Sequence, residues 1–137
     1  MPSKQILVVE DEPSIAETLV HVLSEQGFEA TRVATILEAR ETLENNIYSA
    51  IVLDCGLPDG NGFDFCKEIR KTNEIPILFL TARSDEVDKI VGLEIGADDY
   101  VTKPFSPREV SARLKAIIKR VKEPMSFGQD ILFKVDE

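Results

Sequence analysis

Several side chains that could carry out chemistry stand directly after apolar runs of strand length. Two acids follow the first run, and one acid, one hydroxyl and one amine follow later runs: Glu10, Asp11, Asp54, Thr81 and Lys103. Carboxylate and carbonyl oxygens are the ligands that Mg²⁺ prefers, and a lysine ammonium suits a phosphoryl oxygen. An aspartate beside both can attack phosphorus and form an aspartyl phosphate. These residue types therefore indicate phosphoryl transfer, with Asp54 as the acceptor.

The segment after Asp54 reads CGLPDGNG, which breaks the strand at once. Its glycines and proline turn the backbone away, which leaves the Asp54 carboxylate open and a carbonyl near residue 56 free for a metal. Thr81 could donate a hydroxyl hydrogen bond to the same phosphoryl group. Carboxylates brought close together repel one another, so one pKa should rise unless a cation offsets the charge.

The elements that must position these residues follow an alternating pattern. Apolar runs predict strands, and segments whose apolar residues recur every three or four positions predict helices. The strands are expected at 6–9, 28–33, 48–53, 75–80 and 99–102, and the helices at 13–26, 35–45, 62–71, 85–95 and 106–121. Near-continuous apolar strands separated by helices imply a parallel sheet covered on both faces. The predicted fold class is therefore α/β and doubly wound, with the candidate residues at the carboxyl edge of the sheet.

Length and composition narrow the function classes. The chain has 137 residues, of which 43% are hydrophobic and 30% charged, as expected for one globular domain. Its net charge of -9 argues against nucleic-acid binding by this chain alone. No apolar stretch is long enough for a membrane span or a signal peptide, so we expect a cytoplasmic protein. Cys55 and Cys66 have no metal-ligand spacing and are expected to be free thiols.

Each candidate residue alone also has a plainer interpretation. The acids at 10–12 could stabilise a helix N-terminus, and Asp54 could be a turn residue. Thr81 could be an N-cap, Lys103 a solvated lysine, and Tyr100 an aromatic residue of an edge strand. Their joint placement at strand ends is what favours a site.

The chain resembles the receiver domains of bacterial two-component response regulators over about residues 4–121. The matching segments are VVEDE (8–12), D-x-x-L-P-x-x-N-G (54–62), LTAR (80–83), GADDYVTKPF (96–105) and SPREV (106–110). The form of GADDYVTKPF resembles the OmpR/PhoB group, and 79–110 resembles its CreB-type members. The resemblance implies a CheY-like (βα)5 fold with strand order 2-1-3-4-5. It also implies a receiver domain at 1–121, then at 122–137 a linker and the start of a truncated winged-helix DNA-binding domain.

The resemblance also implies a role for each matching residue. Asp54 would accept a phosphoryl group from a phosphohistidine of a sensor histidine kinase, with Lys103 and Thr81 bonding that group. Mg²⁺ would be bound by Asp11, Asp54 and the Gly56 carbonyl directly and by Glu10 through water. Thr81 and Tyr100 would switch together, and the peptide bond between Lys103 and Pro104 would be cis. The positions that tune autodephosphorylation are Gly56 and Arg83, which is not a familiar pair.

The same resemblance implies a homodimer of phosphorylated chains. Its interface would comprise the fourth helix, the fifth strand and the fifth helix. The expected intermolecular pairs are Lys89 with Glu109, Asp98 with Arg113, and Asp99 with Arg120. The expected apolar patch comprises Ile90, Leu93 and Ala112. Exposed single ion pairs contribute little each, so the apolar patch should matter more.

Three other function classes remain open. A Mg²⁺-dependent phosphohydrolase also forms an aspartyl phosphate, but it needs a second acid two residues after the nucleophile, where this chain has Gly56, and the chain has no room for a capping domain. A single-domain receiver would act by direct contact with a partner protein. A pure interaction module would have lost phosphorylation. The segment SFGQDILFKVDE at 126–137 looks like the opening strand of an effector domain and favours a receiver with an attached output.

Overall fold

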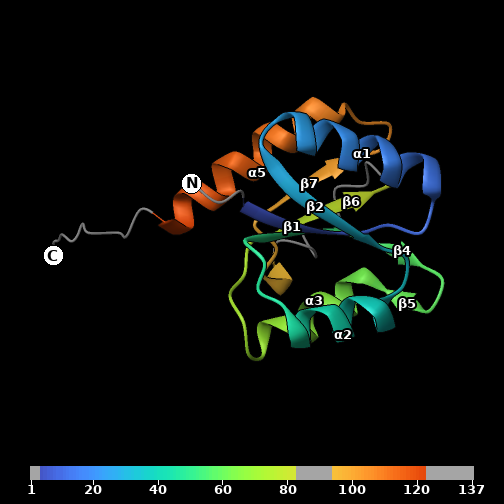
Figure 1. Ribbon diagram of the computed structural model, residues 1–137. Coiled ribbons are helices and arrows are strands. Elements are labelled where there is room, and N and C mark those ends of the chain that lie inside the picture. Colours follow the sequence, from blue (N-terminus) through green and yellow to red (C-terminus); the bar gives the residue numbers. More distant parts are fainter. Residues whose placement is uncertain (1–3, 83–93, 123–137) are drawn as a thin grey trace, which may run out of the picture.

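A parallel sheet of five strands forms the centre of the molecule (Figure 1). The computed structural model describes residues 4–82 and 94–122. The strands of this sheet are β1 (Lys4–Val9), β2 (Phe28–Val33), β3 (Ala50–Asp54), β6 (Ile77–Thr81) and β7 (Asp99–Thr102). They lie in the order β2-β1-β3-β6-β7, and every neighbouring pair is parallel. Counted along the chain, this is the order 2-1-3-4-5, so the predicted fold class is confirmed.

Helices cover both faces of the sheet (Figure 1). On one face lie α1 (Pro13–Glu25) and α5 (Pro107–Lys122), and on the other lie α2 (Ile36–Asn45) and α3 (Gly62–Arg70). The helix predicted at 85–95 falls mostly outside the described residues. Of that segment, residues 94 and 95 are helical. Gly96 follows them with a φ of 112°, a left-handed conformation that suits the end of a helix.

Alternate residues of the strands supply two cores. Ile6 and Val8 of β1 belong to the core beneath α1 and α5, whereas Leu7 and Val9 belong to the core beneath α2 and α3. All residues of β3 and of β6 are buried. Each large aliphatic side chain buried in this way stabilises the fold by roughly 1.5–3 kcal/mol. The continuous apolar runs in the sequence therefore reflect a sheet that is buried on both faces.

Local signals set where the helices begin and end. Pro13 occupies the first turn of α1, and Gly27 follows its end with a φ of 94°. Thr35 caps α2, because its side chain accepts a hydrogen bond from the Glu38 backbone N–H at 3.1 Å. Asn61 caps α3 in the same way through the Phe63 N–H at 2.6 Å. These helices therefore begin within one residue of the positions that the sequence predicts.

The sequence did not predict the hairpin that follows Asp54. Two short strands, β4 (Gly56–Leu57) and β5 (Gly60–Asn61), pair antiparallel in a segment expected to be an irregular loop. The next residue, Gly62, begins α3 and donates its backbone N–H to the Cys55 carbonyl at 2.8 Å. A Cβ atom at Gly62 would collide with the Asp54 carbonyl oxygen and approach the Cys55 Cα to 3.0 Å. Gly62 therefore permits the close packing of this loop beneath the acceptor aspartate.

Three strand predictions were wrong at their first residues: the strand expected at 6–9 begins two residues earlier, at Lys4, and two other strands begin two residues later than expected. The strand expected at 48–53 spans Ala50–Asp54, and the one expected at 75–80 spans Ile77–Thr81. Tyr48 and Ile75 extend the apolar runs because they pack against the core from the segments that lead into the strands. Among the described residues, no helix is both long and apolar enough to cross a membrane.

Candidate functional site

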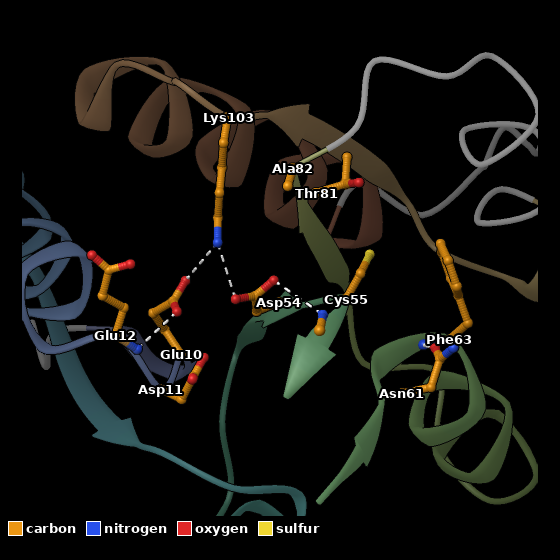
Figure 2. A pocket seen from close by; sticks show the side chains of 11 residues that line it. Glu10, Asp11, Glu12, Asp54, Cys55, Asn61, Phe63, Thr81, Ala82 and Lys103 are labelled. Carbon is orange, nitrogen blue, oxygen red and sulfur yellow. Dashed lines mark hydrogen bonds and ion pairs between the residues drawn. The ribbon is translucent and has the colours of Figure 1, made fainter. Parts of the chain in front are cut away.

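The candidate residues converge at the carboxyl edge of the sheet. Glu10 and Asp11 follow β1, Asp54 is the last residue of β3, Thr81 is the last residue of β6, and Lys103 follows β7. Together with residues of the hairpin they line a pocket of about 560 Å³ (Figure 2). The parallel sheet therefore brings together acids, a hydroxyl and an ammonium that lie up to 93 positions apart in the sequence.

Lys103 points into this pocket and contacts two buried acids (Figure 2). Its Nζ lies 3.1 Å from Asp54 Oδ2 and 3.4 Å from Glu10 Oε1. The peptide bond between Lys103 and Pro104, which was expected to be cis, is cis. The other carboxylate oxygen of Asp54, Oδ1, accepts the Gly56 backbone N–H at 3.2 Å. Asp54 is therefore held between a cation on one side and a backbone donor on the other.

Burial and crowding shift the pKa values at this edge. Burial raises the pKa of Glu10 to about 7, and the neighbouring Asp54 charge adds to the shift, although the Glu12 N–H and the Lys103 charge oppose it. Burial lowers the pKa of Lys103, but its hydrogen bond to Asp54 and the charges of both acids outweigh burial and raise it. The expected increase of one acid's pKa is thus present at Glu10, and one lysine charge does not offset it fully.

The acids at this edge fit a hard divalent cation. Glu10, Asp11 and Asp54 each offer a carboxylate oxygen, and these oxygens lie within 4.8 Å of one another. Glu10 Oε1 is buried and forms an ion pair with Lys103 Nζ at 3.4 Å, but it accepts no hydrogen bond from the described residues. Asp11 is exposed at the mouth of the pocket. A set of oxygen donors with excess negative charge and one unsatisfied buried oxygen is what Mg²⁺ or a similar ion would satisfy.

Arg32 of β2 supports the acidic end of β1, and sequence analysis missed it. Its Nε donates to the Glu10 carbonyl oxygen at 2.9 Å, and its Nη2 donates to the Asp11 carbonyl oxygen at 2.9 Å. The Glu10 backbone N–H donates to the Val33 carbonyl oxygen at 3.0 Å. A single arginine in an edge strand that mixes apolar and polar residues carries no sequence signal for this role. It becomes visible only because β2 lies beside β1 in the sheet.

The two candidate switch residues belong to neighbouring strands. Thr81 is buried at the end of β6, and its carbonyl oxygen accepts the Lys103 backbone N–H at 2.7 Å. Tyr100 of β7 stands beside Phe79 of β6 in the register of the sheet and packs partly buried against the core beneath α2 and α3. Ala82, directly after Thr81, is exposed and lines the pocket.

The residues of the expected dimer face are only partly described. Lys89, Ile90 and Leu93 lie outside the described residues, as does the tuning residue Arg83, and Ala112 is exposed on α5.

Within the chain, those charged residues of this face that the structure describes already have partners. Arg113 bonds Asp99 at 2.9 Å and Glu109 at 3.1 Å, and the Asp98 side chain bonds Arg70 at 3.0 Å. Arg120 donates to the Asp98 carbonyl oxygen at 3.5 Å. The intramolecular partner of Arg113 is thus Asp99, whereas the predicted intermolecular partner is Asp98. The intermolecular pairs stay a prediction.

Comparison with known proteins identifies the family. Residues 6–115 match the family model described as the response regulator receiver domain. The transcriptional regulatory protein CreB of Escherichia coli K12 is 46% identical over 124 residues, which cover 90% of this chain and 54% of CreB. The expected likeness to CreB-type regulators is therefore confirmed. The chain spans about half the length of the curated relatives that it matches.

Solved structures agree with this assignment. The receiver domain of the Francisella response regulator 1452 superposes with a TM-score of 0.84 at 35% identity, covering 88% of this chain and 100% of that one. DrrB of Thermotoga maritima, an OmpR/PhoB homologue, superposes with a TM-score of 0.80 at 33% identity, covering 88% of this chain and 54% of DrrB. The fold, the family match and the relatives agree, and this chain belongs to the response regulator receiver domain family, with relatives among the OmpR/PhoB regulators.

Proposed function

We propose that this domain accepts a phosphoryl group on Asp54 in a Mg²⁺-dependent reaction and thereby switches an attached transcriptional output. The observation that carries the proposal is the position of Lys103 Nζ, within 3.4 Å of both Glu10 and Asp54 at the edge where Asp11 also lies. This arrangement supplies a nucleophile, a cation for a phosphoryl oxygen, and oxygen ligands for a metal in one open pocket.

The transfer is a displacement at phosphorus, in which Asp54 replaces the donor histidine. An Asp54 carboxylate oxygen forms the new P–O bond, and the P–N bond to the donor histidine breaks, with the imidazole nitrogen keeping the electron pair. Lys103 neutralises charge on the phosphoryl oxygens, and the Thr81 hydroxyl donates a hydrogen bond to one of them. Water later attacks the same phosphorus, the P–O bond to Asp54 breaks, and inorganic phosphate leaves while Asp54 returns to a carboxylate.

Asp11, Asp54 and the Gly56 carbonyl would hold Mg²⁺, with Glu10 acting through water. When bound, the ion would supply charge neutralisation for the transferring group. The burial of Glu10 and the lack of a hydrogen bond to its Oε1 from the described residues support this assignment. The exposed position of Asp11 leaves one side of the site open to solvent and to a phosphoryl donor.

The phosphoryl group would then bias a two-state element. Thr81 would move toward it, and Tyr100 would turn inward beside Thr81. The output would be a dimer through the face that contains β7 and α5, coupled to a DNA-binding domain beyond residue 122. A sensor histidine kinase would be the donor, and the cytoplasm the location. The CreB relative, a transcriptional regulatory protein of which this chain covers 54%, supports an attached output domain.

The test is incubation with acetyl phosphate, followed by intact-mass and light-scattering measurements. We expect one added phosphoryl group that requires Mg²⁺, that Asp54→Asn abolishes, and that shifts the chain toward a dimer. Asp64→Asn is the matched control, because Asp64 is an exposed aspartate on α3 that does not line the pocket. Wild-type protein that gains no phosphoryl group in this incubation would overturn the proposal. Addition without dimerisation would retain the chemistry and favour a single-domain receiver that acts by direct contact.

A phosphohydrolase remains the alternative enzyme class. It would release inorganic phosphate from small phosphate esters through many turnovers. Incubation with a small phosphate ester and Mg²⁺ in place of acetyl phosphate tests this class, because repeated release of inorganic phosphate from the ester would favour it. The residue two positions after Asp54 argues against a phosphohydrolase, because such an enzyme needs an acid there and this chain has Gly56.

A further inference from the structure

Asp59 lies at the tip of the hairpin that follows the acceptor aspartate, and its side chain reaches a different element. Asp59 Oδ1 accepts the Ile36 backbone N–H at 2.9 Å, and Oδ2 accepts the Leu37 backbone N–H at 3.0 Å. These are the first two residues of α2. One carboxylate thus ties the hairpin tip to the start of α2 through two hydrogen bonds, 22 or more positions apart in sequence.

Two further observations show that this contact is built into the loop. Hydrogen bonds from the Ile36 and Leu37 N–H groups lower the pKa of Asp59, and the charge of Arg40 contributes to the same effect, so the carboxylate stays ionised. A Cβ atom at Gly60 would lie 2.8 Å from the Ile36 Cδ1, so the hairpin packs closely against the residue that Asp59 bonds. The hairpin tip and the first turn of α2 therefore form one packed contact.

The other end of this hairpin carries the metal-binding carbonyl of the proposed function. Gly56 begins β4, and its N–H bonds Asp54 Oδ1. At the base of the hairpin the Gly62 N–H bonds the Cys55 carbonyl. The hairpin is thus fixed at its base by backbone contacts and at its tip by Asp59. The direction of the Gly56 carbonyl depends on both anchors, because β5 is the one strand that pairs with β4 in the described part of the chain.

We propose that Asp59 is a positioning residue that holds the Gly56 carbonyl in place for Mg²⁺ by anchoring the hairpin to the first turn of α2. The inference rests on the proposed function, since it assigns Asp59 to the same metal site. Asp59 itself does not touch the metal or the phosphoryl group. Removal of a group that orients a metal ligand without contacting the metal typically lowers the metal affinity by about 10–100-fold.

The experiment compares Asp59→Ala with Thr35→Ala in the whole chain. Thr35 caps the same helix through the Glu38 N–H at 3.1 Å, a hydrogen bond that does not involve the hairpin. Both variants weaken the start of α2, so the midpoint temperature of thermal unfolding should fall in both. Only Asp59→Ala should raise the Mg²⁺ dissociation constant measured by calorimetry, by about tenfold. Without Mg²⁺, amide exchange at Gly62 should also be faster in Asp59→Ala than in Thr35→Ala.

Asp59→Asn separates geometry from charge. It removes the same negative charge as Asp59→Ala but keeps a carbonyl oxygen that can accept one of the two hydrogen bonds. An intermediate Mg²⁺ affinity would support positioning, whereas an affinity equal to that of Asp59→Ala would indicate a charge effect and overturn the inference.

Equal Mg²⁺ affinity and equal Gly62 exchange in Asp59→Ala and Thr35→Ala would overturn the inference and leave the proposed function intact. Wild-type protein that binds no Mg²⁺ and takes up no phosphoryl group would overturn both.

Discussion

Gly62→Ala tests whether the loop beneath Asp54 has room for any side chain. Alanine normally stabilises a helix relative to glycine by about 1 kcal/mol, and Gly62 is the first residue of α3. Its φ is not positive, so alanine could adopt the same backbone conformation. The new Cβ, however, would meet the Asp54 carbonyl oxygen and carbon and the Cys55 Cα, all of them backbone atoms. These atoms cannot rotate away as the end of a side chain could.

The two effects have opposite signs, and the steric one should dominate. Overpacking of a tight site costs about 1–3 kcal/mol, and contacts with backbone atoms favour the upper half of that range. After the helix propensity gain is subtracted, we expect the free energy of unfolding to fall by about 1–2 kcal/mol. Because the displaced atoms belong to Asp54 itself, we also expect slower phosphorylation by acetyl phosphate.

Urea denaturation measures the stability change, and intact mass against time measures the phosphorylation rate. Gly56→Ala is the matched control for stability, because no atom lies within 4 Å of a Cβ at that position. Its free energy of unfolding should change by less than about 0.5 kcal/mol. A Gly62→Ala variant as stable as Gly56→Ala, or more stable than the wild type, would show that the loop can move away and would refute the steric reasoning.

Three further variants or reagents probe the rest of the site. Lys103→Met should lower the free energy of unfolding by about 2 kcal/mol, because it leaves two buried carboxylates without their cation. In urea denaturation, added Mg²⁺ should restore part of the lost free energy of unfolding. A variant whose free energy of unfolding does not change when Mg²⁺ is added would contradict this prediction. Arg32→Gln should raise the Mg²⁺ dissociation constant on the order of tenfold in calorimetry, because two bonds to the acidic turn are lost. Iodoacetamide should label Cys55 much faster than Cys66, since burial raises the pKa of the Cys66 thiol and hides it; equal labelling rates by mass spectrometry would refute this.

The sheet and the convergence of the site residues could be predicted because both depend on sequence patterns that extend over whole strands. A strand buried on both faces needs a continuous apolar run, and parallel strands place their carboxyl ends at one edge. The positions of the strands alone were therefore enough to predict that Asp54 and Thr81 lie at the same edge of the sheet. The ends of strands were less predictable, because Tyr48 and Ile75 are apolar for packing outside the sheet.

The supporting residues could not be predicted in the same way. Arg32 and Asp59 are charged, exposed residues, and they are two of many, since the sequence contains 16 Lys or Arg residues and 25 Asp or Glu residues. Asp59 also stands in a Pro-Asp-Gly segment, where an aspartate is expected for turn formation alone. What distinguishes each of them is a backbone partner more than 20 positions away, and such partners are set by tertiary packing.

The charges of the expected dimer face bear on how strongly phosphorylated chains could associate. Asp98 already accepts hydrogen bonds from Arg70 and from the Ile77 backbone N–H at 2.8 Å, and Asp99 already accepts from Arg113. An intermolecular pair would replace an intramolecular pair of the same kind. Exchanging one partly exposed ion pair for another contributes close to zero net free energy. If this face dimerises, the free energy must therefore come from apolar contact and from a phosphorylation-dependent rearrangement, while the charges select the register of the two chains.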